Sequence, residues 1–232
     1  MSRSCRFRAR RLSRRPYASR VRAPPRLRGG LAARLALLVA GLFLFAVGIV
    51  CFLESRLGLP PWDVLHLGIA RHTPLSFGEA NVAVGVTVLA IAWLLGARVG
   101  IGTVANAVII GAFLELFLSI GAIDRLSDAP LGARASLLVA GVAAVGAGSG
   151  LYLGAQLGAG PRDSLMVVGA HRTRFRIGVV RAALELSALS AGVALGGTIG
   201  LGTLAFAILI GPAVEGSFWL LERSPLVVPT PA

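Results

Sequence analysis

The sequence predicts an all-α, polytopic membrane protein: a transmembrane helical bundle built from two three-span repeats. Three observations lead to this prediction. The 232-residue chain is 56% apolar and has a mean hydropathy of +0.80, unlike an ordinary soluble domain. It contains several apolar runs, each long enough to cross a bilayer as a helix. Its two halves also share a pattern at a constant offset of 100 residues.

The repeat needs no gap. Between Ala33 and Glu115, 29 positions are identical to the residue 100 further on. The shared motifs are Gly-x-x-Pro-x-Asp-x-Leu at 58–65 and 158–165, and Gly-x-Gly-Thr at 100–103 and 200–203. A repeat of this size indicates a duplicated fold, and duplicated halves around a central site are typical of membrane transporters.

The first 30 residues are interpreted as a disordered, Arg-rich cytoplasmic tail. All 23 basic side chains are arginine, and 11 of them lie in residues 3–28 without an acidic residue. A short basic segment ahead of a span indicates a cytoplasmic N-terminus. Clustered arginine also suits nucleic acid, but we expect no nucleic-acid partner. The apolar run at 35–53 recurs at 135–153, which favours a span over a signal peptide.

The predicted organisation is a membrane repeat at 31–122, a second at 131–223 and a cytoplasmic tail at 224–232. Apolar runs predict spans at 34–54, 79–96, 102–120, 135–157, 177–197 and 203–221.

Within each repeat a short segment, 61–72 or 161–172, follows the first span. It begins with proline, which suits the first turn of a helix. At roughly 18 Å as a helix the segment is too short to span, so it should be re-entrant or interfacial.

Charge does not decide the number of crossings. The arginines between spans follow the positive-inside rule with six crossings, and about as well with eight, where the short segments would cross. Length favours six, which makes the repeats inverted; eight would make them parallel. Both arrangements place the N- and C-termini in the cytoplasm. The aromatic side chains near predicted span ends are interpreted as interfacial anchors: Trp62, Trp93, Tyr152 and Trp219.

Repeated carboxylates are the first candidates for a substrate or ion site. Asp63 and Asp163 lie in the first turns of the short segments, where they can cap N–H groups or belong to a broken-helix binding site. Glu115 and Glu215 lie late in the third span of each repeat. Because charge within a membrane is costly, they are either an ion or proton site or carboxylates that cap a neighbouring helix.

Other candidates occur in one repeat only. Arg181 and Glu185 are four residues apart, so they can pair on one helical face; they either mark a ligand site or form a pair in which Arg181 reaches the interface. Asn106 suits ligand binding or an interhelical hydrogen bond. The halves differ at these places: Asn81/Arg181, Gly85/Glu185 and Asn106/Phe206. We interpret such differences as better markers of a ligand or partner than the shared positions.

Chemistry beyond binding is not indicated. The chain has no HExxH motif and no Cys-x-x-Cys pair, so we expect neither an enzyme nor a metal or other cofactor. Gly-x-Gly-Thr lacks the lysine of a phosphate loop. The glycines at 146, 150, 154 and 158 form a ridge suited to close helix packing, and Gly-rich faces of this kind suit a homo-oligomer.

The motifs at 58–63, 75–78 and 100–107, followed by Ile110-Gly111, resemble the YczE/YyaS/YitT family of bacterial integral membrane proteins, in particular its YczE-like members. The resemblance covers roughly residues 31–222. It implies a bacterial cytoplasmic-membrane protein of five or six spans. The members are largely uncharacterised, so the resemblance assigns no catalytic or binding residue.

The leading functional hypothesis is a small-solute transporter or permease that works by rocking of the two repeats. Its partners would be the lipid bilayer and a small solute or coupling ion. The alternative is a non-transporting membrane scaffold or regulatory protein. A transporter requires a polar cavity between the repeats, lined by the intramembrane charges, whereas a scaffold can have a dry, glycine-packed centre.

Overall fold

The computed structural model describes residues 25–120, 124–175 and 177–227. Within these ranges the chain is helical, without strands beyond an isolated bridge between Leu27 and Val227. The all-α prediction is therefore confirmed. The helices are α1 (Leu31–Ser55), α2 (Pro61–His72), α3 (Phe77–Leu94), α4 (Ile101–Leu118), α5 (Leu131–Gly154), α6 (Pro161–Thr173), α7 (Ile177–Ala194) and α8 (Leu201–Glu222), with a short 3₁₀ helix, η1 (Asp124–Asp128), before α5.

Among the described residues, five helices are long and apolar enough to cross a membrane: α1, α3, α4, α5 and α8. The sequence predicts a further span at 177–197, where the structure has α7, an 18-residue helix that is not among those five. The short helices α2 and α6 have 12 and 13 residues, which is too few to span as helices. The exact number of crossings stays a prediction.

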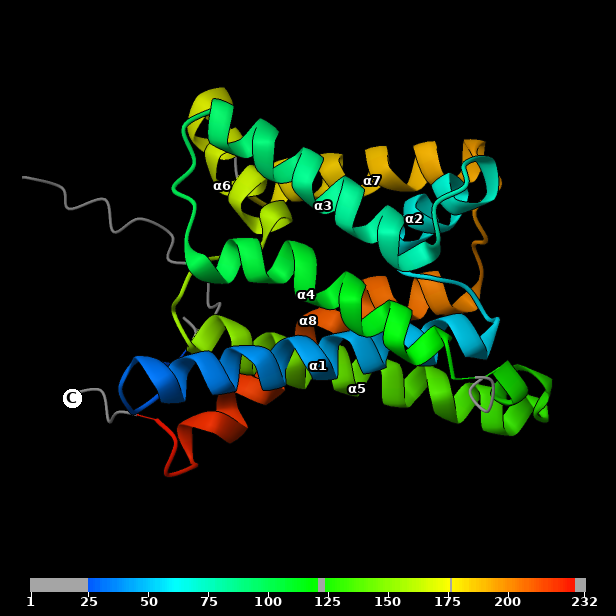
Figure 1. Ribbon diagram of the computed structural model, residues 1–232, viewed down its shortest axis with the longest axis horizontal. Helices are drawn as coiled ribbons and strands as arrows, with labels where there is room; N and C mark the ends of the chain where they lie inside the picture. The colour runs from blue at the N-terminus through cyan, green and yellow to red at the C-terminus, as the bar shows by residue number, and fades with distance from the viewer. Residues whose placement is uncertain (1–24, 121–123, 176, 228–232) are drawn as a thin grey trace, which may run out of the picture.

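The longer helices run in alternating directions along the long axis of the molecule (Figure 1). α1 and α5 pack side by side and antiparallel, because Gly41 meets Gly148 while Gly48 meets Gly141. A Cβ atom on Gly41 would lie 2.8 Å from the carbonyl oxygen of Gly148. Glycine therefore allows the backbones of α1 and α5 to approach closely.

The two halves exchange equivalent backbone hydrogen bonds. The N–H of Gly102, in the first turn of α4, donates to the carbonyl oxygen of Leu157 at 2.8 Å. The N–H of Gly202, in the first turn of α8, donates to the carbonyl oxygen of Leu57 at 2.7 Å. α4 of the first half is thus anchored to the loop that follows α5, and α8 of the second half is anchored to the loop that follows α1.

The glycines of the repeated motifs are needed at this junction. Gly58 has a φ of +117°, and a Cβ atom there would lie 2.6 Å from the backbone nitrogen of Gly200. Gly158 has a φ of +131°, and its Cβ would lie 2.6 Å from Oγ1 of Thr103. Positive φ and close backbone approach both favour glycine, so the motifs join the halves.

Two equivalent arginines bind the C-terminal ends of α1 and α5. Nε of Arg34, near the start of α1, donates to the carbonyl oxygen of Ala155 at 2.7 Å. Nε of Arg134, near the start of α5, donates to the carbonyl oxygen of Ser55 at 2.7 Å. A cation suits the C-terminal end of a helix, where carbonyl groups lack helical partners.

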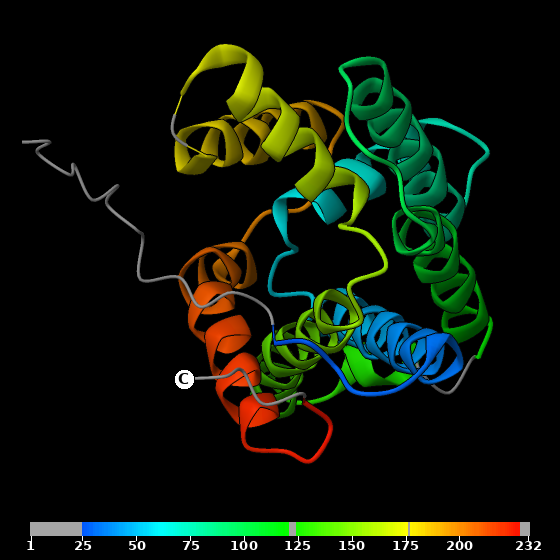
Figure 2. The ribbon, with the colours of Figure 1, turned by 90° about the vertical axis from the view of Figure 1, so that its left-hand side faces the viewer.

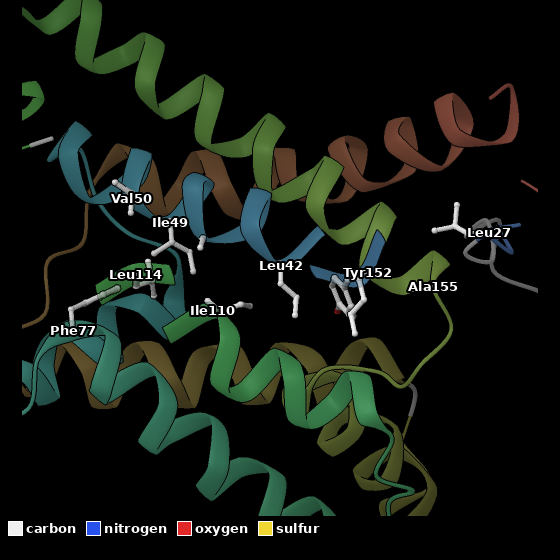
Figure 3. Packing of buried hydrophobic residues seen from close by; sticks show 11 residues of the cluster. Leu27, Leu42, Ile49, Val50, Phe77, Ile110, Leu114, Tyr152 and Ala155 are labelled. Carbon is white, nitrogen blue, oxygen red and sulfur yellow. The ribbon is translucent and has the colours of Figure 1, made fainter. Parts of the chain in front are cut away.

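The apolar core lies between α1, α4 and α5, where Leu42, Ile49, Ile110 and Leu114 are buried (Figure 3). The glycine ridge of α5 packs inside the molecule: a Cβ on Gly146 would lie 2.8 Å from Cβ of Ala213 in α8. Viewed along the long helices, the bundle surrounds α2 (Figure 2).

The predicted N-terminal tail lies largely outside the described residues, but Leu27 is buried and its N–H donates to the carbonyl oxygen of Gly154 at 3.2 Å.

Candidate functional site

The N-terminal ends of α2 and α6 face the same internal cavity, which has a volume of about 190 Å³. Pro60 and Gly160, the residues just before each helix, both line it. Free N–H groups and the helix dipole give such an end a partial positive charge. Two short helices therefore direct their positive ends at one space.

The cavity lies at the junction of the halves and its lining is rich in polar groups. The polar and charged side chains that line it are Trp62, Asp63, Asn81, Asn106, Ser149, Tyr152, Arg162, Asp163, Arg181 and Glu185. Five residues singled out in the sequence are thus brought together: Asp63, Asp163, Asn106, Arg181 and Glu185. Whether they bind a ligand stays a prediction.

The positions at which the repeats differ also line this cavity. Asn81 and Arg181, Gly85 and Glu185, and Asn106 and Phe206 all contribute to its wall. The two halves therefore contribute side chains of different charge and size to the cavity wall.

Asp63 belongs to a buried network in the first half. Nδ1 of His66, a fully buried side chain, lies 3.1 Å from Oδ1 of Asp63 and 3.3 Å from the amide nitrogen of Asn81. Nε2 of His66 lies 3.4 Å from Nη2 of Arg162. Because a guanidinium can only donate, Nε2 accepts there and the ring proton lies on Nδ1, directed at Asp63; the amide nitrogen of Asn81 is then a neighbour of Nδ1 and not its hydrogen-bond donor. Both carboxylate and ring are held in place.

Asp163 has a different partner. The hydroxyl of Tyr152, on α5, donates to Oδ2 of Asp163 at 2.7 Å. Tyr152 is only 5% exposed, so its interpretation as an interfacial anchor is wrong. It positions a cavity carboxylate, because the tyrosine ring supplies apolar bulk and the hydroxyl requires a partner when buried.

Trp62 is also part of the cavity wall rather than an anchor at the membrane surface. It is 7% exposed, and the guanidinium carbon of Arg162 lies 4.8 Å from the centroid of its ring. This is a cation–π contact. Among the described residues, no carboxylate forms an ion pair with Arg162 within 4.0 Å. The guanidinium is therefore not engaged in a direct ion pair, although Asp63, Asp163 and Glu185 line the same cavity.

Arg181 and Glu185 do not form the expected pair: the described part of the chain shows no ion pair between them within 4.0 Å. Both line the cavity. Oε2 of Glu185 is buried without a hydrogen-bond partner. An unpartnered buried carboxylate oxygen is costly and rare, so this atom is a natural acceptor for a donor group of a ligand.

Asn106 lies opposite α6: a Cβ on Gly160 would lie 3.2 Å from its Oδ1. The interhelical hydrogen bond considered for Asn106 is not made among the described residues, and its amide lines the cavity.

Glu115 and Glu215 lie outside the cavity. Oε1 of Glu115 accepts from the N–H of Gly78 at 2.9 Å and from the hydroxyl of Ser76, and so it caps α3. Glu215 is exposed on α8.

The sequence reasoning missed Arg162, Trp62 and Tyr152 as cavity residues, and it missed His66 as the buried partner of Asp63. Trp62 and Arg162 were detectable, because they are a further pair that differs at the 100-residue offset and adjoins the shared aspartates. Tyr152 and His66 carried no such signal. Among the described residues, no three His, Cys, Asp or Glu side chains are placed to share a metal ion.

Comparison with known proteins gives a family but no described activity. Residues 32–217 match the "Family of unknown function (DUF6198)". The chain is 36% identical over 191 residues to an "Uncharacterized protein" of Haemophilus influenzae, covering 82% of this chain and 86% of that protein. It is also 36% identical over 185 residues to the "Uncharacterized membrane protein YczE" of Bacillus subtilis, covering 78% and 83% of the two chains. No solved structure matches. The chain is therefore a membrane protein that belongs to the DUF6198 family and is related to YczE.

Proposed function

We propose that the protein is a small-solute transporter of the bacterial cytoplasmic membrane that works by rocking of its two halves. The observation behind this proposal is the central cavity. Both halves line it, two helix N-termini face it, and it holds a buried carboxylate oxygen of Glu185 without a hydrogen-bond partner. Broken helices whose ends meet at a repeat interface are typical of transporter binding sites. A scaffold would need no such cavity.

The packing supports an inverted arrangement of the halves. α1 and α5 are antiparallel, and if each crosses the membrane, the halves have opposite orientations. α2 and α6 are then re-entrant helices that approach the cavity from opposite faces. The N–H of Arg28 donates to the carbonyl oxygen of Leu226 at 2.7 Å, so the first and last described segments lie together. The Arg-rich tail supports a cytoplasmic position for that side.

A difference between the halves supports rocking. In the first half α3 and α4 are closed on each other, since a Cβ on Gly78 would lie 2.7 Å from the carbonyl oxygen of Gly111. The equivalent Gly178 and Gly211, on α7 and α8, have no atom within 4 Å of an added Cβ. One helix pair is thus closed and its counterpart open. Exchange of these arrangements between inverted halves would open the cavity to the other side.

Transport is tested with purified protein in liposomes, scanning radiolabelled amino acids, amines, organic acids and single-chain amphiphiles with and without a proton or sodium gradient. We expect at least one solute to move, and Arg162→Gln to reduce its uptake at least about tenfold, the effect of losing about 1.4 kcal/mol of binding. Arg98→Gln is the matched control, because Arg98 is exposed and outside the cavity. Failure of every compound to move would rule out the transport proposal, and an Arg162→Gln protein as active as wild type would show that the cavity is not the substrate site.

A further inference from the structure

An apolar groove separates α7 from α8 and opens on the outer surface of the bundle. Its volume is about 700 Å³, within the range of pockets that bind drug-sized molecules. Leu186, Ile199 and Leu204 line it and are each more than half exposed. If α7 and α8 both cross the membrane, this surface faces the hydrocarbon chains of the lipids. The groove is therefore open to a molecule that arrives from within the bilayer.

The groove leads to the central cavity. Arg181, Glu185, Phe206 and Ile210 line both spaces. The inner end of an apolar groove thus carries two opposite charges, with Arg162 and the α6 N-terminus beyond them. The closed α3–α4 pair of the other half has Asn81 and Gly85 at the equivalents of Arg181 and Glu185. The charges therefore occur only on the side that carries the groove.

The combined shape is that of an amphiphile. A polar headgroup fits the charged cavity, and one apolar chain fits the groove. We propose, on the basis of the transport function above, that the substrate is a single-chain amphiphile with a zwitterionic headgroup. It enters between α7 and α8, and its chain stays in the groove while its headgroup occupies the cavity.

The charges of the cavity specify the headgroup. Asp63 and Asp163, the other carboxylates of the cavity, are paired with His66 and Tyr152. The guanidinium groups of Arg162 and Arg181 lack a carboxylate within 4.0 Å among the described residues, so they can bind a phosphate or carboxylate. Oε2 of Glu185 lacks a donor, whereas the ring of Trp62 already stacks on Arg162. An ammonium group that donates hydrogen bonds satisfies Glu185. A headgroup with only an anionic group would leave Glu185 without a donor. A headgroup with only an ammonium group would leave the two guanidinium groups without an anion.

The test uses Trp62 as the reporter. Trp93 and Trp219 are exposed, and the Trp93→Phe/Trp219→Phe protein retains Trp62 as its single tryptophan. In nanodiscs, lysophosphatidylethanolamine with a brominated chain is titrated below its micellar concentration, with the unbrominated lipid as the control for quenching. We expect saturable quenching. Brominated lysophosphatidylglycerol, which lacks the ammonium, and lysophosphatidylcholine, which cannot donate, should bind at least about tenfold more weakly.

Variants that fill the groove measure the contribution of the apolar chain to binding separately from that of the headgroup. Ala207→Phe and, independently, Ala182→Leu add bulk to opposite walls of the groove. Each should weaken binding of lysophosphatidylethanolamine at least about tenfold and leave the affinity for chain-free glycerophosphoethanolamine, measured by calorimetry, unchanged. Ala207→Ser is the matched control and should bind both compounds as wild type does.

The outcomes are distinguishable. Quenching that is equal for all headgroups and in both filled variants would mean ordinary contact with bilayer lipid and would overturn the inference. Transport of a chain-free solute with no binding of the lysolipid would overturn the inference and leave the transporter proposal standing. Specific, groove-dependent binding of the lysolipid without movement across the bilayer would support the site and contradict transport.

Discussion

Arg162 lies over the ring of Trp62, with its guanidinium carbon 4.8 Å from the ring centroid, and the two residues occupy equivalent positions 100 apart in the sequence. Each follows the first proline of a short helix, α2 or α6. The first turns of the two short helices therefore meet at the cavity. The duplication supplied the same position twice, and the two copies diverged into an aromatic ring and the cation that stacks on it.

This contact should contribute measurably to stability. In a double-mutant cycle of Trp62→Leu and Arg162→Gln, we expect a coupling energy of about 1–2 kcal/mol, since desolvated cation–π pairs reach that range. Reversible unfolding in mixed micelles measures it. The control is the exposed pair of Trp219 and Arg223, in which the guanidinium carbon lies 3.6 Å from the ring centroid. This pair should give a smaller coupling energy. Equal coupling in the two pairs would contradict a desolvated contact at the cavity.

Glu115 should stabilise the fold, and its repeat counterpart should not. Glu115→Ala removes the acceptor of the Gly78 N–H and should lower the unfolding free energy by about 1–2 kcal/mol, as loss of a helix cap does. Glu215→Ala is the matched change at an exposed position and should lie within about 0.5 kcal/mol of wild type. Thermal unfolding in detergent gives both values. A larger loss for Glu215→Ala would show that Glu215 has a structural role of its own.

The junction glycines should resist substitution for two separable reasons. Gly58→Ala combines a φ of +117° with a Cβ placed 2.6 Å from the backbone of Gly200, so we expect a severe loss of folded protein. Gly96 has a φ of +95°, but a Cβ there would have no atom within 4 Å. Gly96→Ala should therefore lower the unfolding free energy by only about 1–2 kcal/mol, through local backbone strain. Gly132→Ala meets neither obstacle and should be tolerated. Yield and monodispersity after size-exclusion chromatography rank the three.

The helical class and the place of the short helices could be predicted from sequence, because hydropathy, length and Pro61/Pro161 act locally. The clustering of Asp63 with Asp163 could be anticipated from the broken-helix pattern but not located, since it depends on how the halves pack. Glu115 shows what sequence position alone does not distinguish. Its sequence position fits an ion site and a helix cap equally well, and only the position of Gly78 on a neighbouring helix identifies the cap.

Aromatic residues misled the sequence reasoning for a physical reason. A tryptophan or tyrosine near a predicted span end suits the lipid interface, but the same local pattern occurs where a helix end meets a neighbouring helix inside the protein. Trp62 at the start of α2 packs on Arg162 and Tyr152 at the end of α5 bonds to Asp163, so both are buried at the cavity, while Trp93 remains 65% exposed.

Closure of α7 on α8 should be detectable by cross-linking. In the closed pair, a Cβ on Gly111 would lie 2.3 Å from Cγ2 of Val82, and the equivalent residues of the open pair are Gly211 and Ala182. If the halves exchange arrangements, Ala182→Cys and Gly211→Cys should form a disulfide in membranes under mild oxidation, and its formation should stop solute uptake until reduction. The background carries Cys5→Ser and Cys51→Ala, which removes both native thiols.

The control pair is Ala182→Cys with Gly216→Cys, because Gly216 lies more than one turn further along α8 and is also free of neighbours within 4 Å. Random encounter of two exposed thiols would cross-link both pairs at similar rates, whereas closure selects the pair at 182 and 211. Absence of that cross-link in protein that is folded and active would show that α7 and α8 stay apart during turnover. In that event the open groove would be a permanent binding surface and the rocking mechanism would be wrong.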